Sequence, residues 1–257
     1  MSDWNSNQYL KYENERTQPS IDLTNRIRID TPQKIIDVGC GPGNSTNVLA
    51  RRFPGAHILG IDNSPNMIET AKGKYPALDF LLCDASRDLD TLDNDFDVVF
   101  SNACIQWIPN HYQLLKKMME RLKKEGVLAV QTPDTSDAPI HKILKEVSSS
   151  QRWASHFQFS QASHNNLTQG EYYDLLDDIS SDFSMWRTTY FHTMKSHKDI
   201  IEWYRGTGLR PYLSVLSEDD KQTFEHDLHA ELINVYPLQK NGDIIFRFSR
   251  LFFTAMA

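Results

Sequence analysis

The stretch KIIDVGCGPGNST, Lys34 to Thr46, passes directly from apolar residues into a loop with glycines at positions 39, 41 and 43. An apolar run followed by dense glycines is typical of a strand that turns into a helix where a ligand approaches bare backbone. The spacing differs from the G-x-G-x-x-G of dinucleotide-binding folds. A tight turn that binds no ligand would also explain these glycines, so other parts of the sequence are needed to distinguish the two interpretations.

Short apolar segments recur at roughly twenty-residue intervals from Lys34 to Pro133, and segments with a helical pattern lie between them. Strands that alternate with helices in this way predict a parallel sheet built from βαβ units. The near-continuous apolar character of the runs indicates strands covered on both faces. The five predicted strands are 34–39, 57–62, 79–84, 97–102 and 126–132.

The intervening helices carry signals at their ends. Asn44 and Ser45 predict the cap of a first helix, and Ser64 followed by Pro65 predicts the start of a second. A third helix over 112–125 would end at Gly126. We interpret His111, at the start of that helix, as a capping or solvated residue.

The regular alternation stops after Pro133. We expect an irregular connection over 134–165 with one short helix near 139–147, and then a helix over 168–180, a strand at 185–194, a long helical segment over 196–236 and a strand within 242–255. The simplest organisation is a single domain over 1–257. Its nucleotide-binding core would be about 30–133, with helical cap elements from 1–28, 134–165 and 196–236.

Polar residues close the predicted strands: Asp37, Asp62, Asp84 and Asn102. Ligands of open α/β sheets bind at this edge. A carboxylate at Asp62 could accept the ribose hydroxyls, and one at Asp84 the adenine amine. Asp37 adds negative charge at the other end of the ligand, which disfavours a pyrophosphate and favours a sulfonium or α-ammonium group. The pattern therefore favours S-adenosylmethionine over NAD or NADP.

The segment DVGCGPGNS resembles the first motif of class I S-adenosylmethionine-dependent methyltransferases, and Asp62 and Asp84 match the later acidic positions of that family. Further segments resemble the trans-aconitate methyltransferase family along nearly the whole chain except 134–165. These are SDWNSNQYLKYENERTQPSIDL, NACIQWIPNHYQLL, GVLAVQTPD, WRTTYFHTM, TGLRPYL and YPLQKNG.

This resemblance implies a Rossmann-like α/β fold with a mostly parallel seven-stranded sheet, helices on both faces and a helical substrate cap. It implies S-adenosyl-L-methionine as the methyl donor, with S-adenosyl-L-homocysteine as its product. The residues implied to bind this cofactor are Asp37, Gly39, Cys40, Gly41, Asp62, Asn63, Asp84, Ala85 and Asn102.

The resemblance also implies a small tricarboxylate as the methyl acceptor, for which arginine side chains are the preferred partners. The expected substrate-binding residues are Tyr9, Arg16, Trp107, Arg187 and Arg210. Arg187 follows Trp186 on a strand that we expect to be otherwise buried, and for Trp107 core packing is about as plausible as a place in the pocket wall. A carboxylate is ionised at neutral pH, so we predict no catalytic base and no metal.

Composition excludes several classes. There are 27 basic and 34 acidic residues, a formal charge of −7, which argues against a nucleic-acid substrate. The three cysteines lack CxxC spacing and no apolar run is long enough to span a membrane, so we expect a cytoplasmic protein. Two alternatives stay open: a carboxyl methyltransferase for another acid, such as a malonyl thioester, and a non-enzymatic S-adenosylmethionine-binding protein.

Overall fold

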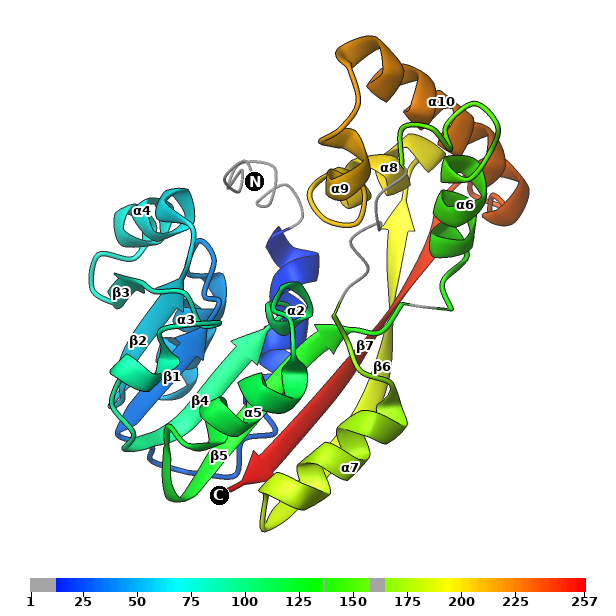
Figure 1. Ribbon diagram of the computed structural model, residues 1–257. Helices are drawn as coiled ribbons and strands as arrows, with labels where there is room; N and C mark the ends of the chain where they lie inside the picture. The colour runs from blue at the N-terminus through cyan, green and yellow to red at the C-terminus, as the bar shows by residue number, and fades with distance from the viewer. Residues whose placement is uncertain (1–12, 136, 158–164) are drawn as a thin grey trace. The chain divides into compact units, whose positions relative to one another are not determined.

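The computed structural model describes residues 13–135, 137–157 and 165–257, and its centre is one seven-stranded sheet (Figure 1). The strand order is β3-β2-β1-β4-β5-β7-β6. The prediction of a Rossmann-like, mostly parallel sheet is confirmed. The strands are β1 (Lys34–Val38), β2 (His57–Asp62), β3 (Asp79–Leu82), β4 (Phe96–Asn102), β5 (Leu122–Pro133), β6 (Asp182–Met194) and β7 (Ile244–Met256).

Strands β1 to β5 pair in parallel, and the arrow of β7 runs opposite to those of its neighbours β5 and β6 (Figure 1). The central strands β1 and β4 are buried along almost their whole length. This agrees with the apolar runs in the sequence, because a parallel strand covered on both faces needs apolar side chains on both. The carboxyl ends of β1 to β4 therefore meet at one edge of the sheet.

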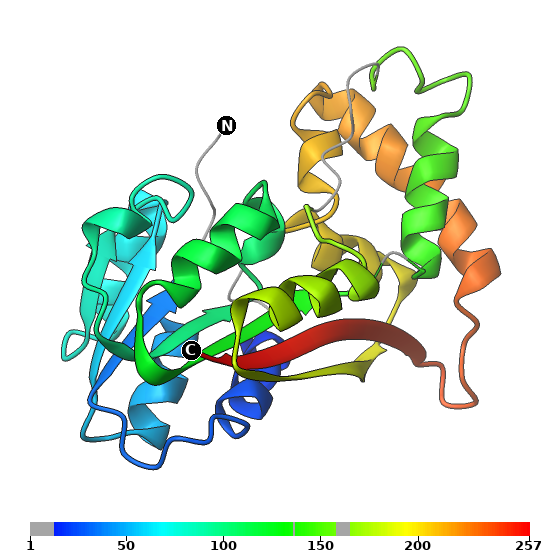
Figure 2. The same ribbon diagram turned by 60° about the horizontal axis from the view of Figure 1, so that its bottom comes forward.

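Helices cover both faces of this sheet. α2 and α3 lie on one face, and α5 and α7 on the other (Figures 1 and 2). The helices are α2 (Glu13–Thr24), α3 (Asn44–Arg52), α4 (Pro65–Lys74), α5 (His111–Met119), α6 (Pro139–Ser148), α7 (Gln169–Ile179), α8 (His197–Arg205), α9 (Arg210–Leu213) and α10 (Glu218–Val235), with short 3₁₀ turns η1 (Leu89–Thr91) and η2 (Ile105–Trp107).

The predicted start of α4 is confirmed, whereas the predicted start of α3 and the predicted end of α5 are wrong. Ser64 caps α4, where its hydroxyl accepts the backbone N–H of Met67. The cap position of α3 is Gly43 in a left-handed conformation, not Asn44 or Ser45. α5 ends at Met119, and the chain enters β5 well before Gly126. The reason is sheet pairing, because β5 already begins opposite Phe96 and a register shift absorbs the extra residues.

The described residues form two compact units. The first comprises those within 1–133, 164–188 and 251–257, and it contains β1 to β5. The second comprises those within 134–163 and 189–250, where α10 packs on α6 and α8. Trp153 and Phe224 form an edge-to-face pair in this unit with ring centroids 5.2 Å apart. Most of the predicted cap segments 134–165 and 196–236 belong to the second unit, and their role as a cap stays a prediction.

Within the part of the chain that the structure describes, every helix is too short or too polar to cross a bilayer.

Candidate active site

The glycine loop is tied to the end of β2 by three hydrogen bonds, and a fourth holds the Asp62 carboxylate from its other side. The backbone N–H groups of Gly39 and Cys40 both donate to the carbonyl of Ile61, at 2.8 and 2.9 Å. The N–H of Gly41 donates to Oδ2 of Asp62 at 3.0 Å, and Oδ1 of Asp62 accepts the N–H of Ser64 at 2.9 Å. The Asp62 carboxylate is thereby fixed beside the loop, and the residue is half-buried.

Asp37 is fully buried beneath the loop. Its Oδ2 accepts the hydroxyl groups of Ser45 at 2.6 Å and Thr46 at 2.7 Å. Burial raises the pKa of Asp37 to about 6, the two hydroxyl groups oppose this shift, and the nearby charge of Asp62 adds to it. Ser45, which the sequence suggested as a helix cap, is used instead to hold this carboxylate.

Two buried acceptor oxygens at this edge have no hydrogen-bond partner within the described residues: Oδ1 of Asp37 and Oδ1 of Asn102. They belong to the ends of β1 and β4, which are neighbours in the sheet. A buried acceptor without a donor costs free energy, and the cost is higher for a charged one. The edge is therefore suited to a ligand that brings N–H donors and positive charge.

Gly39 and Gly41 both have positive φ, 76° and 54°, but their surroundings differ. A Cβ on Gly39 would overlap the Sγ of Cys104, so this glycine is required for packing. A Cβ on Gly41 would meet no atom within 4 Å. Gly41 thus presents bare backbone to open space, as a ligand-binding loop requires.

The remaining predicted cofactor residues follow β2 and β3. Asn63 is exposed and Ala85 is buried. Asp84 is half-buried, and its Oδ1 accepts the N–H and the hydroxyl of Ser86 at 2.9 and 2.7 Å. The structure therefore gathers three carboxylates along one sheet edge, at the ends of three adjacent strands.

Comparison with known proteins decides the family. Residues 29–198 match the model of a methyltransferase domain. The chain is 42% identical over 255 residues to a trans-aconitate 2-methyltransferase from Enterobacter sp. (strain 638), covering 99% of this chain and 98% of that protein. The chain belongs to the methyltransferase domain family.

A second relative and a solved structure agree with this. A trans-aconitate 2-methyltransferase from Escherichia coli (strain 55989 / EAEC) is 41% identical, again over 99% of this chain and 98% of the relative. Phosphoethanolamine N-methyltransferase 2 of Haemonchus contortus, solved in complex with S-adenosyl-L-methionine, has the same fold. Its TM-score is 0.58 at 18% identity, covering 93% of this chain and 52% of that one. This methyltransferase is a class I, S-adenosylmethionine-dependent enzyme, as predicted.

The predicted substrate residues of the methyltransferase are more widely spread. Arg16 is buried on α2, and Trp107 is half-buried in η2. Arg187 is exposed on β6, so the expectation of a buried strand was wrong: β6 is the edge strand, and alternate side chains face solvent. Arg210 is half-buried at the start of α9 in the second unit. Tyr9 lies outside the described residues.

The roles of three side chains, Ser45, Thr46 and His111, were not predicted from the sequence. Ser45 and Thr46 were not assigned to Asp37, although hydroxyl residues eight and nine positions after a buried acid were the available signal. His111 was interpreted as a cap or a solvated residue, which is wrong. It is buried, with Nδ1 bonded to the hydroxyl of Tyr172 at 2.6 Å and Nε2 to the carbonyl of Ile105 at 2.7 Å.

Proposed function

We propose that this methyltransferase esterifies one carboxylate of trans-aconitate or of a closely similar small tricarboxylate. The observation that carries this proposal is the near-full-length likeness, 42% and 41% identity, to two proteins named trans-aconitate 2-methyltransferase. Likeness over 99% of this chain includes the second unit, where Arg210 lies. A net charge of −7 supports a small acceptor rather than a nucleic acid, and a cytoplasmic location stays a prediction.

The cofactor would lie along the edge formed by β1, β2 and β3. We assign the α-ammonium end to Asp37 and the bare backbone of Gly39 and Gly41, with Cys40 between them. Asp62 and Asn63 would take the ribose, Asp84 and Ala85 the adenine, and Asn102 would lie beside the reacting centre. The partnerless Oδ1 atoms of Asp37 and Asn102 support this direction of the ligand, because both need a donor.

When bound, S-adenosylmethionine supplies a methyl group on a positively charged sulfur, which is transferred to a carboxylate oxygen. The acceptor carboxylate is already ionised at neutral pH, so the protein does not need to remove a proton. What remains for the chain is to align the acceptor and to exclude water. Trp107, half-buried in η2 after β4, is suited to form an apolar wall there.

The carboxylates that are not methylated require cations. Arg187 and Arg210 are our candidates for this role, with Tyr9 and Arg16 as further contacts from the N-terminal segment. A guanidinium pairs two oxygens of one carboxylate at once, which fixes orientation as well as charge. Loss of such a contact should weaken binding of the acceptor and leave the affinity for the cofactor unchanged.

The first test is a panel assay with labelled S-adenosylmethionine and trans-aconitate, cis-aconitate, citrate, isocitrate and a malonyl thioester. We expect label in the esters of trans-aconitate with the highest kcat/KM. Label in the thioester alone would refute the proposed acceptor, and cofactor binding without any transfer would indicate a binding protein instead.

The second test uses Arg187→Gln and Arg210→Gln, with Arg28→Gln as a matched control because Arg28 is exposed and outside the proposed contacts. Loss of a charge-assisted contact predicts a KM for trans-aconitate raised about tenfold or more, with the affinity for S-adenosylhomocysteine unchanged. An unchanged KM in both variants would remove these two arginines from the site.

A further inference from the structure

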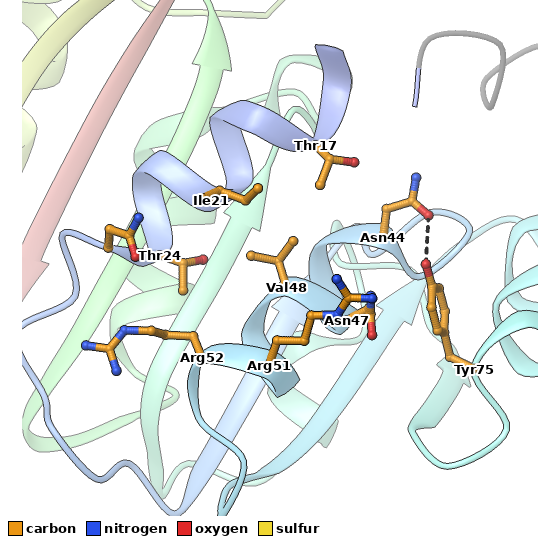
Figure 3. Close-up of a pocket in the computed structure, with 10 residues that line it drawn as sticks. Thr17, Ile21, Thr24, Asn44, Asn47, Val48, Arg51, Arg52 and Tyr75 are labelled. Atoms are coloured by element: carbon orange, nitrogen blue, oxygen red, sulfur yellow. Dashed lines mark hydrogen bonds between the residues drawn. The ribbon is translucent and has the colours of Figure 1, made fainter. Parts of the chain in front are cut away.

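A cavity of about 390 Å³ opens between α2 and α3 in the first unit (Figure 3). This is within the range of small-molecule sites, although at its lower end. None of the described residues that line it is a proposed cofactor or acceptor contact. The cavity therefore shares no lining residue with the edge at which we place the cofactor.

The lining is more polar than two packed helices require. Thr17, Ile21 and Thr24 recur along one side of α2, at the spacing of a single helix face. From α3, Asn44, Val48 and Arg51 contribute at the same kind of spacing, and Arg52 adds a second guanidinium. Helix–helix contacts usually carry an apolar stripe. Here only Ile21 and Val48 are apolar in this set.

The two arginines lack an acidic partner in the part of the chain that the structure describes. Arg51 and Arg52 form no ion pair with any carboxylate within the described residues, and the guanidinium of Arg52 lies over the ring of its neighbour Phe53. Both lie in the last turn of α3, where a cation also interacts with the helix dipole. That effect accounts for basic residues at this position, but it does not account for a cavity beside them.

Two buried polar groups of the lining are also unsatisfied within the described part of the chain. Thr24 is 1% exposed and Asn44 is 8% exposed, and neither the Thr24 Oγ1 nor the Asn44 Nδ2 has a hydrogen-bond partner. Figure 3 shows the Thr24 hydroxyl turned toward α3. The Oδ1 of Asn44, in contrast, is bonded to Lys74 and Tyr75, so this amide is held with its donor nitrogen left over.

We propose that this cavity is a second binding site, for a small molecule that carries an oxyanion, either a phosphate or a carboxylate group. Arg51 and Arg52 supply the positive charge, and Thr24 and Asn44 supply donors that the protein leaves unsatisfied. The chain has a net charge of −7, so two neighbouring arginines beside a cavity, without an acidic partner among the described residues, make this part of the surface locally positive. An anion is the ligand that this positive charge and these donors favour.

The test titrates the full chain by calorimetry with inorganic phosphate and, in a separate arm, with citrate, each with S-adenosylhomocysteine present to occupy the cofactor edge. We expect one of the two to bind with one-to-one stoichiometry. The affinity should fall about tenfold or more in Arg51→Gln/Arg52→Gln and measurably in Thr24→Val. The arm that gives the tighter binding identifies the oxyanion as phosphate or carboxylate.

Two controls separate this site from the active site. Arg28→Gln removes a positive charge outside the cavity, so it should leave the affinity unchanged. The Arg51→Gln/Arg52→Gln variant should keep its KM for trans-aconitate, whereas Arg187→Gln should keep its anion affinity in the phosphate arm. The proposal is refuted if neither anion binds the wild type, if the Arg51→Gln/Arg52→Gln variant keeps the wild-type affinity for both anions, or if Arg28→Gln weakens binding as much as the cavity variants do.

Discussion

Replacing Asp37 by Asn tests the central feature of the active site, a buried carboxylate that pairs with no cation among the described residues. The side chains have nearly the same shape, and the amide oxygen of Asn can still accept the hydroxyl groups of Ser45 and Thr46, which lie 2.6 and 2.7 Å from Oδ2. The substitution therefore removes charge with little change in packing. Its effect on stability should depend on pH, and its effect on cofactor binding should have the opposite sign.

The magnitude follows from the pKa of Asp37, which burial raises from 3.8 to about 6. That difference makes the ionised carboxylate cost the ligand-free fold about 3 kcal/mol relative to its protonated form. Because the pKa is raised in the folded state, the wild type is favoured below pH 3.8 and loses this contribution as the pH rises through about 6. Asn does not titrate, so the variant keeps its stability across this window.

The assay is urea denaturation of the ligand-free chain, followed by circular dichroism at intervals from pH 4 to pH 8. We expect the free energy of unfolding of Asp37→Asn, relative to wild type, to rise by about 2.5 kcal/mol between these two limits, because the carboxyl of the unfolded chain is already partly ionised at pH 4. The surface control Asp177→Asn, on an exposed position of α7, should show no such trend. A constant difference at every pH would refute the inferred cost of the buried charge.

The same variant tests the proposed contact with the cofactor. A charged acceptor for the α-ammonium group is lost, so the affinity for S-adenosylhomocysteine at pH 8 should fall about tenfold or more in calorimetry. The wild-type affinity should also fall as the pH drops below about 6, because Asp37 becomes protonated, and this fall should be absent in Asp37→Asn. Equal affinities at pH 8 would mean that the carboxylate does not face the ligand.

Two further predictions concern the loop and the core. Gly39→Ala should unfold at a much lower temperature than Gly41→Ala, because a Cβ at 39 overlaps the Cys104 side chain whereas at 41 only backbone strain of about 1–2 kcal/mol applies; equal melting temperatures would contradict this. Tyr172→Phe should lower the free energy of unfolding by about 1–3 kcal/mol, because it leaves a buried nitrogen of His111 without its partner. Burial lowers the pKa of His111 in the folded state below its usual value of 6.5. The neutral imidazole therefore stabilises the fold above pH 6.5, and this stabilisation is lost as the pH falls, which denaturation at pH 5 and 8 would detect.

The sheet could be predicted because its signals are local and agree with one another. Each of β1, β2 and β4 is an apolar run with a polar residue at its carboxyl end, and Ser64 with Pro65 marks the start of α4 through its own hydrogen bond. Strands in a βαβ series point the same way, so their polar ends had to meet at one edge. The placement of Asp37, Asp62 and Asn102 in the candidate site follows from this argument.

Most of the features that were missed depend on partners distant in sequence. Gly126 is a reasonable helix terminator by local rules, but pairing of Leu122 with Phe96 ends α5 earlier. The exposure of Arg187 follows from the position of β6 at the sheet edge, which only the strand order reveals. His111 looks like a surface residue until Tyr172, on α7, is placed beside it. Local patterns do not contain these pairings.

At Asp37 the arrangement that would best stabilise the ligand-free fold differs from the one that would best bind a cationic ligand. Two hydroxyl groups satisfy its Oδ2, whereas its Oδ1 has no donor within the described residues, and Asp62 adds a like charge nearby. A further protein donor to Oδ1 would stabilise the empty fold, but it would occupy the atom that a cationic ligand needs. A pyrophosphate would be repelled by both carboxylates, so the edge discriminates against dinucleotides by charge, whatever the spacing of its glycines.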